Sequence, residues 1–168
     1  MEFIQAILKF LAEIPPFCVI YPYEAGVLFR GGNVSRELDA GIYLKWPIYD
    51  HVEKINKMEQ EVDVPEQAIT TCDGKVYVVS TTIRYRVEDV GLAVCSVFDY
   101  DKNIIGQTSK LVTEATAKTN SDEFTASKLE KDLLPMLRDY ASERGMGILG
   151  VGFNQWVQNP IVIHLTKQ

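Results

Sequence analysis

The segment KVYVVSTTIRYRVED, residues 75–89, alternates its side chains with a period of two over a dozen positions. Such alternation, rich in β-branched and aromatic residues, is typical of a β-strand. One face carries Tyr77, Val79, Thr81, Ile83, Tyr85 and Val87. The other face is polar along most of its length, so we expect it to be solvated or to meet a partner. Asp73-Gly74, just before the segment, is a typical hairpin turn and predicts an antiparallel pair with the preceding residues.

Further strand patterns precede this hairpin. Residues 18–34 predict a short strand, a turn and a second strand that closes on Gly31-Gly32, because paired glycines accept the positive φ of a tight hairpin. An apolar, aromatic strand is predicted between Gly41 and Pro47, and two short strands are predicted on either side of Pro65. The first half of the chain is therefore predicted to be β-rich.

The second half has a helical period instead. One helix is predicted over residues 101–119. A second begins with Ser127 and Glu130, a capping box whose side chains satisfy free amide hydrogens of the first turn. Its apolar stripe ends near Gly145, at a place typical of a glycine that terminates a helix.

The segment ERGMGILGVGF, residues 143–153, places Gly145, Gly147 and Gly150 at the G-x-G-x-x-G spacing of a dinucleotide-binding loop. That loop requires a strand before it and a helix after it, whereas here the predicted order is helix, glycine, strand. We therefore predict no bound cofactor. Gly145 is expected to cap the helix and Gly147 to open the strand. Gly150 and Gly152 are expected to leave one strand face bare for close approach by another element.

Composition excludes several functional classes. The 168 residues suffice for one domain, and the formal net charge of −6 argues against a general nucleic-acid binder and a polybasic membrane anchor. The three cysteines lack metal-finger spacing and the two histidines have no nearby ligand partners, so no metal site is predicted. No hydrolase, P-loop or metalloprotease motif is present, and no catalytic residues can be chosen; we expect the protein not to be an enzyme.

The N-terminal segment, residues 1–17, is predicted to be an amphipathic helix. Its apolar side chains at helical spacing are Phe3, Ile4, Ile7, Leu8, Leu11 and Ile14. Pro15-Pro16 ends it after about 14 residues, where a membrane-spanning helix needs about 20, and it lacks the basic start of a signal peptide. Two interpretations stay open: the helix packs on its own domain or a sister subunit, or it lies in the membrane interface.

Three blocks of the sequence, residues 19–55, 62–94 and 141–153, together resemble the SPFH (stomatin/prohibitin/flotillin, or band 7) domain family. The first block carries Gly26-Val27, Arg30-Gly31 and Gly41-Ile42-Tyr43, followed by Pro47 and Asp50. The second carries Thr71, Asp73-Gly74, Tyr85, Arg86-Val87 and Asp89, and the third carries Gly147-Ile148. The resemblance extends over roughly residues 18–157.

This resemblance implies an α+β fold with a curved, mostly antiparallel sheet, two packed helices and a final strand. It divides the chain into an N-terminal helix that contacts membrane or subunit (1–17), an SPFH-like domain (18–160) and a C-terminal tail (161–168). Family members are mostly not enzymes; they associate with membranes through an N-terminal apolar segment and self-assemble. They organise lipid microdomains and modulate bound proteases or channels.

The resemblance therefore implies a membrane-associated, homo-oligomeric scaffold on the cytoplasmic face, with a lipid surface and a client protein as partners. Phe3, Ile4, Ile7, Leu8, Leu11 and Ile14 would contact the membrane. Cys18 stands where some members are acylated, and a buried core cysteine is an equal alternative. Members usually continue into a coiled coil, but this sequence ends at Gln168 without heptads, so it is either truncated or assembles through the domain alone. The alternative function is a soluble structural subunit, for example of a viral assembly.

Overall fold

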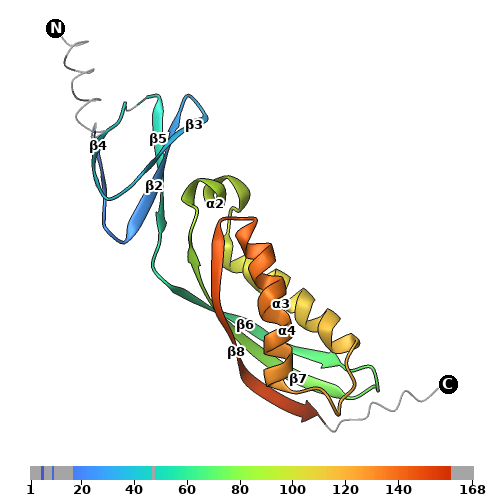
Figure 1. The fold of residues 1–168 in the computed structure, drawn as a ribbon. Helices are drawn as coiled ribbons and strands as arrows, with labels where there is room; N and C mark the ends of the chain where they lie inside the picture. Colours follow the sequence, from blue (N-terminus) through green and yellow to red (C-terminus); the bar gives the residue numbers. More distant parts are fainter. Residues whose placement is uncertain (1–4, 6–8, 10–16, 47, 160–168) are drawn as a thin grey trace. The chain divides into compact units, whose positions relative to one another are not determined.

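A computed structural model describes residues 5, 9, 17–46 and 48–159, and these residues belong to two compact units (Figure 1). The first unit joins the described residues up to Met58 with Val87–Phe98. The second joins Glu59–Arg86 with the chain from Asp99 onward. The predicted α+β class is confirmed, because antiparallel strands and helices both occur in the described chain.

The first unit contains two small antiparallel sheets and a short helix. Its strands are β1 (Phe17–Ile20), β2 (Glu24–Arg30), β3 (Asn33–Leu38), β4 (Gly41–Leu44) and β5 (Asp50–Asn56). β1 pairs with β4, and the other sheet has the order β3-β2-β5. The predicted glycine hairpin is confirmed: Gly31 and Gly32 join β2 to β3 with φ of 58° and 84°.

The second unit is a three-stranded sheet with two long helices (Figure 1). Its strands are β6 (Gln60–Thr70), β7 (Val76–Val87) and β8 (Met146–Asn159), and its helices are α3 (Tyr100–Ala117) and α4 (Ala126–Ser142). β7 lies in the middle of the sheet and pairs antiparallel with β6, as the Asp73-Gly74 turn predicted. The six residues of the predicted apolar face of β7 are all buried.

The core of the second unit is built from that face of β7 and one side of each helix. Ile104 and Val112 of α3 and Leu133 and Leu137 of α4 are nearly inaccessible to solvent. Complete burial of such a side chain stabilises a fold by about 1.5–3 kcal/mol. The apolar residues that recur at helical spacing in this half of the chain are therefore the ones that α3 and α4 bury in the core.

Four details differ from the sequence predictions. Pro65 does not separate two strands, because a bulge between Val64 and Gln67 absorbs it within one strand. The short helix α2 (Val90–Ser96) was not predicted. The capping box is wrong: Thr125, not Ser127, is the N-cap of α4, and it makes no side-chain cap hydrogen bond. The described strands also form three small sheets and not one curved sheet.

Candidate functional site

One face of the β1–β4 sheet is apolar and exposed to solvent. The register opposes Phe17 to Leu44 and Val19 to Ile42, and directly opposed residues project from the same face of a sheet. All four side chains are exposed, and Ile42 and Leu44 are about three-quarters exposed, at 76% and 74%. We call these four residues the β1–β4 face. Adjacent apolar exposure of this kind is uncommon outside binding surfaces.

The opposite face of the same sheet is packed. Ile20 joins Leu28 and Leu38 in a buried cluster, against which Cys18 and Tyr43 pack. Ile20 of β1 lies very close to the backbone of β2 at Gly26, because a Cβ atom at Gly26 would lie 2.6 Å from the Cδ1 atom of Ile20. Gly26 therefore permits β1 to pack on β2. With this face packed, the β1–β4 face is the one that is exposed to solvent.

A turn after β4 extends this apolar surface. Trp46, Ile48 and Tyr49 are each at least two-thirds exposed, at 67%, 76% and 68%, and we call them the exposed turn. The backbone of the turn is ordered by hydrogen bonds, because the amides of Tyr49 and Asp50 both donate to the carbonyl oxygen of Trp46. The three large side chains are thus displayed on a closed turn.

An ion pair holds this turn to the neighbouring strands. Arg30 of β2 donates from Nε and Nη2 to the two carboxylate oxygens of Asp50 in β5, at 2.7 and 2.9 Å. The Trp46 amide donates to the same carboxylate at 2.9 Å. These bonds from Arg30, then from Trp46, lower the pKa of Asp50 to about 2. Asp50 is therefore ionised near neutral pH and fixes the base of the turn.

A shallow hollow of about 410 Å³ opens beside this ion pair. Arg30, Gly31, Trp46 and Tyr49 line it. The Arg30 side chain is 56% exposed, whereas that of Asp50 is inaccessible, so the guanidinium covers the carboxylate and faces outward. The hollow combines aromatic walls with one cationic group.

The membrane-contacting residues predicted from the sequence lie outside the described part of the chain. They are Phe3, Ile4, Ile7, Leu8, Leu11 and Ile14. Their role therefore stays a prediction. Cys18 is half-buried and packs against the core of the first unit. Its acylation also stays a prediction.

No helix within residues 17–46 and 48–159 has both the length and the apolarity needed to cross a bilayer. Nor do those ranges contain a cluster of three side chains able to hold a metal ion.

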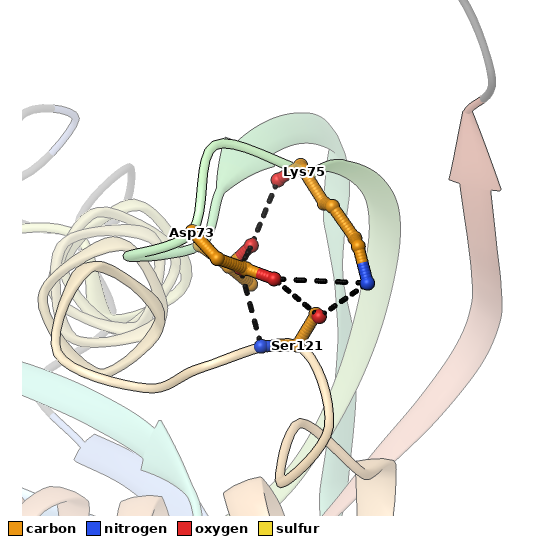
Figure 2. A network of polar contacts seen from close by, with 4 residues as sticks. Asp73, Lys75 and Ser121 are labelled. Atoms are coloured by element: carbon orange, nitrogen blue, oxygen red, sulfur yellow. Dashed lines mark hydrogen bonds and ion pairs between the residues drawn. The ribbon is translucent and has the colours of Figure 1, made fainter.

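A second polar site lies in the second unit, where the β6–β7 turn meets the loop between α3 and α4 (Figure 2). Asp73 accepts hydrogen bonds from the Ser121 hydroxyl, from the Ser121 amide at 3.2 Å and from the Thr71 hydroxyl at 2.6 Å. Lys75 donates from Nζ to the Ser121 hydroxyl oxygen at 2.6 Å. The Cys72 amide adds a backbone bond to Thr119 at 3.1 Å.

This network is better suited to holding two loops together than to catalysis. The hydrogen bonds from Ser121 and then Thr71 lower the pKa of Asp73 to about 2, so the carboxyl is ionised. A nucleophilic serine needs a base that can accept its proton. Here the Ser121 hydroxyl donates a hydrogen bond to the Asp73 carboxylate, whose low pKa makes it a weak base, and it accepts a hydrogen bond from Lys75. The arrangement therefore fastens the turn.

The four glycines singled out from the sequence lie at the junction of α4 and β8. Gly145 follows the last turn of α4 with φ of 73°, and Gly147 is the second residue of β8, which begins at Met146. The predicted order of helix, glycine and strand is confirmed. A Cβ atom at Gly150 would lie 3.1 Å from Nη2 of Arg84, while one at Gly152 would meet open space within the described chain.

The exposed turn and the Arg30–Asp50 pair were missed in the sequence predictions. An apolar strand was predicted between Gly41 and Pro47, and apolarity by itself does not distinguish an exposed strand face from a buried one. A usable signal existed: Trp46 precedes Pro47 and Tyr49 follows it by two residues, and large aromatic residues in a loop are uncommon without a partner.

The comparisons with known proteins agree on one family. The sequence model described as the SPFH domain / Band 7 family matches residues 18–153. An uncharacterised protein of Methanocaldococcus jannaschii is 29% identical over 153 residues, which cover 91% of this chain and 72% of that protein. A stomatin homolog of Pyrococcus horikoshii is 32% identical over 105 residues, or 62% of this chain and 37% of the homolog.

Another relative is an uncharacterised protein of Methanothermobacter thermautotrophicus, 33% identical over 100 residues, which cover 60% of this chain and 31% of that protein. The matched region thus spans about a third of the Methanothermobacter and Pyrococcus proteins and nearly three-quarters of the Methanocaldococcus protein. The family match includes both Arg30–Asp50 and the Asp73 network.

Proposed function

The chain belongs to the SPFH domain / Band 7 family, and on that premise we propose that it is a non-enzymatic, membrane-associated scaffold protein. In this proposal it self-assembles, lies on the cytoplasmic face and organises membrane or partner proteins. Family membership and the likeness to a stomatin homolog support the membrane-associated scaffold role.

The observation that carries the proposal for this chain is the apolar surface of the first unit. The β1–β4 face and the exposed turn present Ile42, Leu44 and Ile48 about three-quarters exposed, with Trp46 and Tyr49 beside them. Removing each fully exposed large apolar side chain from water would contribute about 1.5–3 kcal/mol. A bilayer provides such an apolar environment, and the predicted membrane helix directly precedes β1 in the sequence.

The same surface also fits the alternative of a soluble structural subunit. In that case a second copy of the chain would cover the β1–β4 face. The two functions differ in what covers the apolar surface, so measurements with and without lipid separate them.

Flotation with liposomes tests the proposal, using the intact chain and a variant that lacks residues 2–16. We expect the intact chain to float with lipid and the shortened chain to float less. Equal recovery of both in the unbound fraction would remove the membrane role. A native mass measurement in lipid-free buffer complements the flotation experiment. A single oligomer that dissociates when residues 2–16 are deleted would favour the alternative function of a soluble structural subunit.

A further inference from the structure

We propose that the hollow beside Arg30 binds the phosphate of a phospholipid headgroup, with Trp46 and Tyr49 at the same depth of the bilayer. The inference rests on the proposed membrane association. It adds the lipid chemistry that the exposed turn recognises.

The Arg30 guanidinium has donors left for such a phosphate. A guanidinium carries five N–H donors, and the fork onto Asp50 uses one at Nε and one at Nη2. The Nη1 group takes no part in this fork, and it makes no other hydrogen bond to a residue that the structure describes. Because Asp50 is inaccessible and Arg30 is 56% exposed, the remaining donors are on the open side. Arginine pairs with phosphate through short, charge-assisted bonds of this kind.

The aromatic side chains of the hollow match the chemistry of the bilayer interface. Trp and Tyr are enriched at the level of the headgroups, because their rings are apolar while their N–H and O–H groups remain polar. Trp46 and Tyr49 line the same hollow as Arg30, and both are about two-thirds exposed. An aromatic pair beside a guanidinium with unused N–H donors therefore supplies both apolar contact and phosphate recognition.

The charge of this part of the chain allows it to approach an anionic surface. Residues 17–58 contain five basic and five acidic residues and are neutral, although the whole chain carries −6. The basic ones are Arg30, Arg36, Lys45, Lys54 and Lys57, and the acidic ones are Glu24, Glu37, Asp39, Asp50 and Glu53. The segment Val87–Phe98, which also belongs to the first unit, adds Glu88 and Asp89, so most of the acidic excess lies elsewhere in the sequence. The hollow can meet phosphate with less repulsion than the total charge suggests.

Tryptophan fluorescence tests the proposal on the full chain. The chain has two tryptophans, so Trp156→Phe leaves Trp46 as the reporter. Vesicles of phosphatidylcholine are compared with vesicles of an uncharged galactolipid that has no phosphate. We expect a blue shift of Trp46 emission with phosphatidylcholine, and stronger quenching by lipids brominated near the headgroup than by lipids brominated near the chain end. Trp46→Phe is the control, because Trp156 packs on Phe124 in the second unit, with ring centroids 4.4 Å apart.

Arg30→Lys keeps a positive charge beside Asp50 but removes the planar fork. We expect about tenfold weaker partition onto phosphatidylcholine vesicles, the value of one charge-assisted hydrogen bond. Partition onto galactolipid vesicles should weaken less, because there only the support of the turn by the fork is lost. Circular dichroism checks that the variant is folded, and Tyr49→Ser provides a second, exposed substitution that should reduce binding to both lipids.

Several results would overturn the inference. One is that the protein floats with vesicles while the emission spectrum of Trp46 is unshifted. Another is that the protein with Arg30 intact binds phosphatidylcholine and galactolipid vesicles with equal affinity. A blue shift that follows protein concentration without lipid would show that a second copy covers the turn. Loss of flotation with every lipid would overturn the proposed membrane role as well, so the two failures are distinguishable.

Discussion

Arg30 and Asp50 are directly opposed residues of β2 and β5, and their side chains form a two-point ion pair at 2.7 and 2.9 Å. The carboxylate of Asp50 also accepts the amide of Trp46, so one buried acidic group joins two strands and the turn that displays Trp46 and Tyr49. The exposed turn is thus a supported surface, and its shape depends on a charge that can be titrated.

We predict that the stabilisation from Asp50 disappears in acid. Its pKa falls from 3.8 to about 2 in the folded state, and a carboxyl group with a lowered folded-state pKa stabilises the fold above its unfolded pKa. Urea unfolding of the wild type and Asp50→Asn should therefore differ by a constant free energy near neutral pH. That difference should shrink as the pH falls from about 4 to about 2. The exposed Asp39→Asn is the control, and the same pH dependence for both variants would refute the assignment.

Gly26→Val should destabilise the first unit. Its Cβ atom would lie 2.6 Å from Ile20 and 3.3 Å from Val52, and overpacking of this kind costs about 1–3 kcal/mol. Chemical unfolding measures the effect, with Gly152→Val as the matched control, because nothing described lies within 4 Å of a Cβ atom there. Equal stability of the two variants would mean that β1 does not depend on close packing at Gly26.

Gly150→Val and Gly152→Val test the proposed close approach of another element to β8. Within the described chain only the guanidinium of Arg84, which also pairs with Glu59, would have to move at Gly150, and nothing at Gly152. We therefore expect the folded monomer to persist while assembly weakens, as measured by native mass spectrometry. Wild-type assembly in both variants would show that this strand face takes no part in subunit packing.

Asp73→Asn should loosen the β6–β7 turn from the α3–α4 loop. The substitution replaces a carboxylate that accepts from Thr71 and twice from Ser121 with a neutral amide, and charge-assisted bonds are the stronger ones. Hydrogen exchange at the amides of Cys72 and Ser121 should become faster. Lys75→Met, which leaves the Asp73–Ser121 bonds in place, should have a smaller effect. Unchanged exchange in Asp73→Asn would show that the network does not hold the loops.

The regular elements could be predicted because their side-chain period reports burial directly. β7 alternates over its whole length, and α3 begins at Tyr100, after the N-cap Asp99, whose side chain accepts the Lys102 amide at 3.0 Å. α2 was missed because its seven residues include Gly91 and give too few turns for a helical period. The capping box failed because Thr125 begins α4 earlier than the sequence signal suggested.

The candidate surface could not be predicted, because it depends on contacts distant in sequence. Phe17 meets Leu44 only through the β1–β4 pairing, and Arg30 meets Asp50 only through the register of β2 and β5. A hydrophobic pattern identifies apolar strands but does not say that one face of such a strand stays uncovered. The resemblance to the SPFH family indicated a membrane role and placed it in residues 1–17, whereas the described surface begins at Phe17 and lies mostly beyond that segment.

Liposome flotation of Ile42→Ser/Leu44→Ser against Met136→Ser/Val157→Ser tests the central proposal most directly. Both pairs replace exposed apolar residues, the first on the β1–β4 face and the second in the second unit, so stability should change by only about 0.5 kcal/mol per site. We expect the first variant to lose most of its lipid binding and the second to float like the wild type. Equal flotation of all three proteins would contradict the assignment of the β1–β4 face as the membrane-contacting surface.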